Sequence, residues 1–176
     1  MENEQINTQA HIALVAGASG FIGRFLIAEL LQQGHQVFAL VRDQKTQQTS
    51  LTNWLIRKGI SLNKLIFVQG DVTQPQLGMS EHDWKKLSGV NTLYNSSALF
   101  SWNLSMQQAR AVNVEGALNL LNCVHQYCAL KRAVHMSGYM LTIETHLQQA
   151  GVYIEQPERT EWSSVYKYLG AYEASK

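Results

Sequence analysis

The feature that most constrains the fold of this chain is the stretch of residues 11–34, HIALVAGASGFIGRFLIAELLQQG. Ile12–Ala16 is a short apolar run, which is typical of a buried strand. Residues 24–31 carry apolar side chains at helical spacing, and Gly34 follows as a helix C-cap. Three glycines separate the two patterns. A strand, a glycine turn and a helix in this order predict a nucleotide site.

Each of the three glycines has a distinct physical role in such a turn. Gly17 lets the chain turn tightly off the strand, and Gly20 lets the backbone approach a pyrophosphate without an intervening Cβ. Gly23 lets the new helix pack against the sheet. The start of that helix then offers free N–H groups and the positive end of its dipole to an anion. The alternative is a glycine-rich turn that binds no ligand.

The rest of the chain alternates between predicted strands and predicted helices. Further short apolar runs indicate strands over 36–41, 65–68, 91–94 and 132–136. Helical patterns cover 51–58, 84–87, 106–127 and 165–176, whereas 45–50 and 141–162 read as irregular segments. This alternation predicts an α/β fold, a doubly wound parallel sheet with helices on both faces. We expect one domain over 11–176, preceded by a disordered polar tail over 1–10.

The longest helical pattern, 106–127, defines an expected core face. The residues of that face are Ala109, Val112, Leu120, Leu121 and Val124.

Composition excludes several classes of function. The net charge of +1 gives no electrostatic reason to expect nucleic acid or an anionic membrane as a partner. No segment approaches the roughly 20 apolar residues of a membrane span. Cys123 and Cys128 are five residues apart on one predicted helix, so they form neither a disulfide nor a metal pair, and the six histidines are scattered. We therefore expect a cytoplasmic protein without a metal site.

A tyrosine and a lysine at helical spacing are the second chemical signal. Tyr172 and Lys176 share one face of a helix, and a nearby cation lowers the pKa of a phenol, which makes it a usable general acid. The same spacing occurs in Tyr127 and Lys131. That pair lies just before the strand at 132–136, at the sheet edge remote from a cofactor, so we interpret it as structural.

In these two motifs the chain resembles the extended short-chain dehydrogenase/reductase superfamily. More narrowly, it resembles the fatty acyl-CoA and thioester reductase-like branch of that superfamily. The resemblance rests on AGASGFIG and YEASK for the superfamily, and on GDVTQPQLGMSEHDWKKL, YNSSALFSW, AVNVEGALNLLNCV and AVHMSG for the branch. Members of the family continue beyond the tyrosine–lysine motif with a further strand and a substrate lobe. The resemblance therefore implies the N-terminal, cofactor-binding portion of a larger reductase.

The resemblance also implies roles for individual residues. The pyrophosphate would be lined by the glycine turn: Gly17, Ser19, Gly20, Phe21, Ile22 and Gly23. Asp71 and Val72 would flank the adenine, although a strand-ending Asp that caps a turn is the alternative. The family's Asn-Ala-Ala stretch beside the cofactor is matched by Asn95, Ser96 and Ser97.

For catalysis, the resemblance implies that Tyr172 donates a proton and that Lys176 holds the nicotinamide ribose. Asn113 matches the asparagine that helps to place a proton-relay water, unless it is simply a polar residue on an apolar helix. The chain departs from the family after the fifth strand, where Gly138 replaces the second of two hydroxyl residues. We assign the carbonyl-polarising role to Ser137, and the alternatives are that Thr142 serves instead or that this role is weakened.

Cofactor type depends on the end of the second strand. An acidic residue there holds the ribose hydroxyls of NAD, whereas an arginine accommodates the 2′-phosphate of NADP. Arg42 precedes Asp43, so NADP is favoured over NAD. The expected partners are thus a nicotinamide dinucleotide and a small carbonyl or acyl-thioester substrate; a homodimer is left open. The alternatives to a reductase are a nucleotide-sugar epimerase or dehydratase and a non-catalytic dinucleotide sensor.

Overall fold

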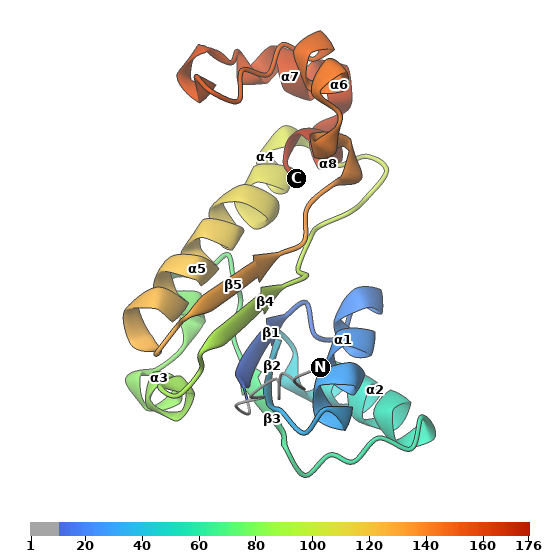
Figure 1. Cartoon of the computed structure of the whole chain (residues 1–176), viewed down its shortest axis with the longest axis vertical. Helices are drawn as coiled ribbons and strands as arrows, with labels where there is room; N and C mark the ends of the chain where they lie inside the picture. The colour runs from blue at the N-terminus through green and yellow to red at the C-terminus, as the bar shows by residue number, and fades with distance from the viewer. Residues whose placement is uncertain (1–10) are drawn as a thin grey trace, which may run out of the picture.

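The structure is a computed structural model that describes residues 11–176, so the predicted disordered tail over 1–10 lies outside the described residues. Five parallel strands form one sheet in the order β3-β2-β1-β4-β5 (Figure 1). The strands are β1 Ile12–Ala16, β2 Gln36–Val41, β3 Leu65–Gln69, β4 Thr92–Asn95 and β5 Arg132–His135. This order, which reverses between β1 and β4, is that of a Rossmann-type dinucleotide-binding sheet. The predicted α/β class is confirmed.

Helices cover both faces of this sheet. Alternate side chains of β1 and β2 pack on one face against α1, Phe21–Gln32, and α2, Gln44–Arg57. The other side chains of the same strands pack against α3, Glu81–Leu87, and α5, Gly116–Tyr127. Because the strands are buried on both faces, they read as continuous apolar runs rather than as alternating ones.

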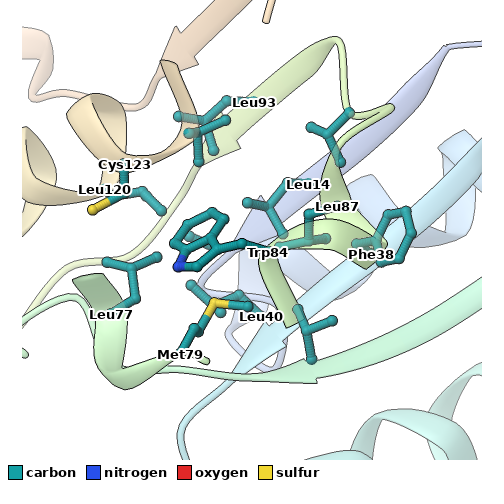
Figure 2. Packing of buried hydrophobic residues seen from close by; sticks show 14 of the residues in the cluster. Leu14, Phe38, Leu40, Leu77, Met79, Trp84, Leu87, Leu93, Leu120 and Cys123 are labelled. Carbon is teal, nitrogen blue, oxygen red and sulfur yellow. The ribbon is translucent and has the colours of Figure 1, made fainter. Parts of the chain in front are cut away.

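The indole of Trp84 lies in the middle of the second of these cores, between the sheet and α5 (Figure 2). It stacks on the ring of Tyr127, with 4.8 Å between the ring centroids. This contact fixes the end of α5 that lies before β5. It supports the structural interpretation of Tyr127 and Lys131.

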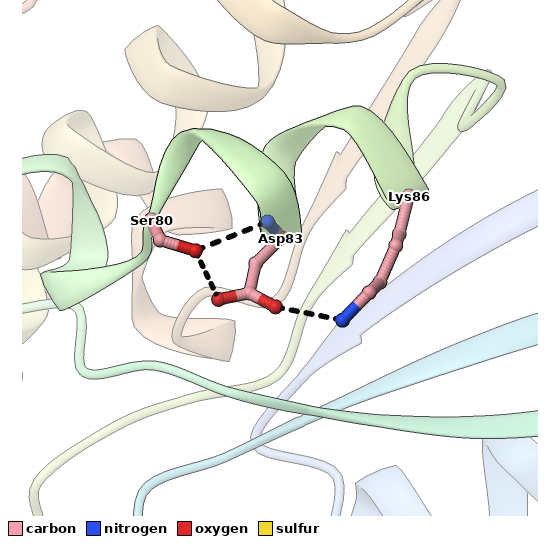
Figure 3. Close-up of polar contacts among 3 residues, drawn as sticks. All are labelled: Ser80, Asp83 and Lys86. Atoms are coloured by element: carbon pink, nitrogen blue, oxygen red, sulfur yellow. Dashed lines mark hydrogen bonds and ion pairs between the residues drawn. The ribbon is translucent and has the colours of Figure 1, made fainter.

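Helix α3 begins at a side-chain cap. The Ser80 hydroxyl accepts a hydrogen bond from the Asp83 backbone N–H at 3.2 Å and donates one to the Asp83 carboxylate at 2.7 Å (Figure 3). The same carboxylate pairs with the Lys86 ammonium at 3.0 Å. These bonds lower the pKa of Asp83. They also place Trp84 on the buried face of the helix.

Three helical predictions need correction. The helix expected over 51–58 begins at Gln44, because Asp43 caps it and its polar first half faces solvent. The helix over 106–127 is confirmed in extent but contains a π-helical segment, Arg110–Glu115, between α4, Met106–Ala109, and α5. Leu121 was expected in the core and is 38% exposed, because α5 presents Leu120 and Val124 to the sheet instead.

The region after β5 differs most from expectation. The segment over 141–162 is not a plain loop: it contains short helices, which with the preceding turn are η3 Tyr139–Thr142, α6 Glu144–Gln149 and η4 Pro157–Arg159. The single helix expected over 165–176 is two helices, α7 Trp162–Leu169 and α8 Ala171–Ala174. Gly170, at φ +81°, separates them. Helices α6 and α7 lie beyond one end of the sheet rather than over a face (Figure 1).

Within residues 11–176, no helix has the length and apolar character that a bilayer span requires.

Candidate functional site

The glycine turn after β1 is packed so closely that its glycines are structurally required. Gly17 has φ +76°, and a Cβ there would lie 2.7 Å from the backbone of Ser96 and Ser97. A Cβ on Gly23 would lie 2.1 Å from the carbonyl oxygen of Gly17. The ends of β1 and β4 therefore approach each other across Gly17, and α1 packs directly on the turn through Gly23.

The start of α1 is suited to an anion. Gly20 is the N-cap, no side chain caps it, and the first turn of this 12-residue helix carries no acidic residue. The Arg24 guanidinium donates hydrogen bonds to the carbonyls of Ser19 at 3.1 Å and Gly20 at 3.2 Å. Arg24 thus adds positive charge beside the helix N-terminus. Sequence reasoning missed this residue.

A cleft of about 210 Å³ opens at the carboxyl ends of the strands, where the strand order reverses. Most of the predicted cofactor residues line it: Gly17, Ser19, Gly20, Arg42, Asp71, Val72, Ser96 and Ser97. Lining residues that the sequence reasoning did not select include Leu40, Gln47, Gly70, Thr73, Leu99 and Val112. Their common signal is position, since they follow strands or face the strand ends.

Four predicted cofactor residues are not in the wall of this cleft. Phe21 and Ile22 have exposed side chains, so what they offer at the helix start is backbone N–H. Gly23 is taken up by packing on Gly17. Asn95 faces the other way: its Oδ1 accepts hydrogen bonds from the N–H and hydroxyl of Ser97, and its Nδ2 lies 3.1 Å from Nδ1 of His135.

At the end of β2, the two candidate selectors have separate positions. Arg42 lines the cleft. Asp43 caps α2 and accepts a hydrogen bond from the Thr46 N–H at 3.1 Å, which lowers the pKa of Asp43. The Gln47 amide oxygen accepts hydrogen bonds from the N–H groups of both Arg42, at 2.7 Å, and Asp43, at 3.1 Å. The Asp43 carboxylate, which is the candidate for binding ribose hydroxyls, therefore caps α2.

At the end of β3, Asp71 forms the turn cap that was the alternative considered from the sequence. Its Oδ1 accepts hydrogen bonds from the backbone N–H of Thr73 at 2.9 Å and from the Thr73 hydroxyl at 2.8 Å, which is an Asx-turn. Asp71 also lines the cleft together with Val72. The side chain of Val72 packs closely against Gly116 of α5, where a Cβ would lie 2.8 Å from the Val72 Cγ2 atom.

Asn113 lies in the π-helical segment and is buried. Its Oδ1 accepts a hydrogen bond from the Leu99 N–H at 2.7 Å, and its Nδ2 donates to the Leu99 carbonyl at 3.2 Å and to the Ser175 hydroxyl at 2.9 Å. Both amide hydrogens are therefore in use. The side chain joins the loop after β4 to helix α8, and π-helical turns of this kind are frequent at functional sites.

Lys176 lies at the end of β5, whereas Tyr172, on α8, lies against the loop after β4. Helix α8 ends at Ala174, so Lys176 lies beyond the helix and not on the helix face where the sequence predicts it. The Lys176 ammonium donates a hydrogen bond to the Met136 carbonyl at 2.8 Å, and burial lowers the pKa of Lys176. The Ser137 hydroxyl donates to the carbonyl of Lys176. The Tyr172 ring packs edge-on against Phe100.

A second, larger and mostly apolar cavity of about 610 Å³ lies between α5, β5 and the short C-terminal helices. Asn95, Asn113 and Lys176 belong to its wall. The predicted site residues are thus divided: eight cofactor candidates line the glycine-turn cleft, Asn95, Asn113 and Lys176 line the larger cavity, and Ser137 and Tyr172 line neither of the two.

The glycine cleft passes a test of fit for a dinucleotide. Its backbone is bare at Gly20, where a Cβ would have only the Gly17 carbonyl within 4 Å, at 3.1 Å, and its charged wall residues include Arg42. Asp71 is the other charged residue of the wall, and the uncapped helix start matches the diphosphate of such a ligand.

Comparison with known proteins places these features in a family. The chain matches the Male sterility protein family of NAD-binding domains over residues 15–176. It is 30% identical over 125 residues to the nonribosomal peptide synthetase-like enzyme fsqF of Aspergillus fumigatus, covering 63% of this chain and 8% of that protein. It is 29% identical over 153 residues to fatty acyl-CoA reductase 1 of Mus musculus, covering 77% of this chain and 30% of the relative.

Among solved structures, the terminal R domain of the myxalamid PKS-NRPS biosynthetic pathway superposes with a TM-score of 0.64. The two chains are 27% identical, and the match covers 75% of this chain and 35% of the other. The chain therefore spans well under half the length of these relatives. The resemblance inferred from the sequence is confirmed: this chain belongs to the Male sterility protein family of NAD(P)-binding, short-chain dehydrogenase/reductase-like domains.

Proposed function

We propose that this chain is the cofactor-binding portion of an NADP-dependent reductase that acts on an acyl thioester or another carbonyl compound. One observation carries the proposal. Asn113 ties the loop beside the glycine cleft to Ser175, which sets Tyr172 and Lys176 at the ends of β4 and β5. A dinucleotide cradle and a phenol–ammonium pair at the same edge of the sheet are the two parts that such a reduction needs. The reductases among the relatives support the same class of reaction.

In this proposal the glycine turn holds the pyrophosphate through backbone N–H groups at the start of α1. Asp71 and Val72 flank the adenine, and Ser96 and Ser97 lie beside the cofactor. Arg42 binds the 2′-phosphate, which is the reason to favour NADP, because the neighbouring Asp43 is committed to capping α2.

The chemical step divides between the cofactor and this chain. When bound, NADPH supplies a hydride to the substrate's carbonyl carbon. The Tyr172 hydroxyl donates a proton to the carbonyl oxygen. A cation held nearby favours the phenolate that is left, and Lys176 supplies that cation. Ser137 donates a hydrogen bond to the same oxygen once its hydroxyl turns from the Lys176 carbonyl.

Titration with NADPH and with NADH, followed by fluorescence, tests the cofactor assignment. We expect Arg42→Ala to weaken NADPH binding by about tenfold or more, the worth of a charge-assisted hydrogen bond, and NADH binding far less. Arg57→Ala, an arginine at the far end of α2, is the matched control and should change neither. Failure of the unmodified chain to bind either dinucleotide would refute the proposal.

A non-catalytic dinucleotide sensor is the second candidate, and Gly138 favours it, because the residue removes a hydroxyl where the family places one. Tyr172→Phe separates the two functions. The variant keeps the ring that packs on Phe100 and loses only the hydroxyl. A reductase should lose turnover and retain cofactor binding, whereas a sensor should be unchanged in both.

The free thiols of Cys123 and Cys128 support our placing this activity in the cytoplasm, where thiols stay reduced.

A further inference from the structure

The loop between β4 and α4, residues 96–105, carries two aromatic side chains for which the proposed function so far gives no role. Phe100 is 60% exposed and Trp102 is 91% exposed. The Phe100 ring makes an edge contact with Trp102, at 5.8 Å between centroids, and another with Tyr172, at 4.8 Å. The loop, SSALFSWNLS, contains no charged residue. An uncharged aromatic surface therefore continues directly from the proposed proton donor.

The position of this surface is set by a buried side chain. Asn113 binds both backbone groups of Leu99, the residue before Phe100. It also donates a hydrogen bond to Ser175, three residues after Tyr172. A single buried amide thus holds the loop and helix α8 together. The contact between the Phe100 and Tyr172 rings is therefore determined on both sides.

We propose that Phe100 and Trp102 form the wall that receives the apolar acyl chain of the substrate, and that Phe100 also positions the Tyr172 ring. This inference rests on the proposed function, because it takes Tyr172 as the proton donor. Because the Phe100 ring lies 4.8 Å from the Tyr172 ring, a substrate bound at Tyr172 would place part of its chain against Phe100. Covering exposed aromatic rings with an alkyl chain lowers the free energy, because apolar surface is removed from water.

The same surface disfavours the nucleotide-sugar alternative. A sugar nucleotide would bring a diphosphate and hydroxyl groups to this wall, and these need cationic or hydrogen-bonding partners. The loop has hydrogen-bonding side chains such as Ser101 and Asn103 but no cation for a diphosphate, and Phe100 and Trp102 present large apolar rings. This part of the site therefore suits an apolar acyl group better than a sugar nucleotide.

Binding of two thioesters to the chain saturated with NADP⁺, which cannot donate a hydride, tests the wall without requiring turnover. The probes are the decanoyl and acetyl esters of N-acetylcysteamine, measured by calorimetry. We expect Phe100→Ala and Trp102→Ala each to weaken decanoyl binding by about tenfold, as loss of a ring contact predicts, and acetyl binding by less than about twofold. Tyr168→Ala, on α7 and 59% exposed, is the matched control and should change neither.

To test whether Phe100 positions Tyr172, the experiment must measure a property that a loss of packing alone would not change. In turnover of decanal with NADPH, Phe100→Leu should retain the KM, and Phe100→Ala should raise the KM. Both should lower kcat and shift its pH profile, because only an aromatic ring holds Tyr172 edge-on. Restoration of kcat and of the pH profile in Phe100→Tyr, which keeps the ring, supports the role; an unchanged pH profile in Phe100→Leu overturns it.

The outcomes separate this inference from the proposed function. NADPH binding without decanoyl binding, or equal losses for the decanoyl and acetyl probes, refutes the wall and leaves the cofactor assignment standing. Absence of NADPH binding refutes the proposed function itself, whatever the thioesters do. Tighter binding of UDP-glucose than of the decanoyl probe would overturn the assignment to an acyl group.

Discussion

The two halves of the sheet differ in how their functional groups are held. Around β1 and β2, the sheet is covered on both faces by α1, α2, α3 and α5, and both strands are buried along almost their whole length, although the edge strand β3 is partly exposed. Around β5, the strand is exposed at Arg132, Ala133 and His135. The first half builds a cradle from one continuous strand, turn and helix. The second half assembles its candidate catalytic groups from three distant segments.

This difference shows which kind of contact each half depends on. In the cradle, Gly17 and Gly23 are close in sequence and fix the geometry by contact with each other. In the second half, the decisive bonds link residues far apart in the chain: Asn113 to Ser175, 62 residues apart, and Lys176 to Met136, 40 apart. Substitutions should therefore act through backbone packing in the first half and through side-chain ties in the second.

The largest effect is expected in the cradle, from Gly17→Ala. The new Cβ would add a clash with the backbone of Ser96 and Ser97 to the cost of a positive φ, for a loss of about 3 kcal/mol in the free energy of unfolding. Gly151→Ala is the matched control, because Gly151 has the same φ of +76° with nothing within 4 Å. It should cost only about 1 kcal/mol. Urea unfolding measures both, and equal losses would contradict the packing argument.

Asn113→Ala should give the next largest effect, in the other half. It leaves the backbone groups of Leu99 and the Ser175 hydroxyl without their partner, at a cost of about 2 kcal/mol in unfolding free energy. Hydrogen exchange of the Leu99 amide should accelerate, while NADPH binding changes little.

Asn119→Ala sharpens that comparison within the same helical run. Asn119 donates to the carbonyls of Val72 and Gln74, so its loss should disturb the adenine side of the cleft instead. If Asn119→Ala accelerated exchange at Leu99 as much as Asn113→Ala does, the two halves would not be separately held.

The smallest expected effect is on the pH dependence of unfolding. It comes from the carboxylates that cap one helix in each half, Asp43 on α2 and Glu161 on α7. Hydrogen bonds from Ser163 and Ser164 lower the pKa of Glu161 to about 2, and bonds with Thr46 lower that of Asp43. A carboxyl whose folded pKa is depressed stabilises the fold above its unfolded pKa and loses that contribution as pH falls through the folded value.

For Glu161 this window runs from its unfolded pKa of 4.5 down to about 2. Glu161→Gln should therefore reduce the acid sensitivity of unfolding in that window, and NMR titration of the carboxyl carbon should report the low pKa directly. A titration of Glu161 near 4.5 in the folded chain would show that the cap does not hold α7.

The cradle was predictable from the sequence because its determinants are local. An apolar run, glycines at fixed spacing and a helical pattern occupy one stretch of the chain, and each constrains its neighbour directly. The start of α2 was missed, because the polar residues after Asp43 look like a loop until the cap and the buried Leu51 and Leu55 are seen together.

The sequence alone determined the alternation of the five strands with their helices and the place of the glycine turn, and it predicted the tyrosine–lysine pair. Only the tertiary structure decided that Arg42 lines the cleft while Asp43 caps a helix, that Gly170 divides the last helical run, and that Phe100 meets Tyr172. The physical reason is how far along the chain each kind of interaction acts. Periodicity and turn chemistry act between neighbouring residues, whereas these arrangements depend on hydrogen bonds and ring contacts between segments that only the folded sheet brings together.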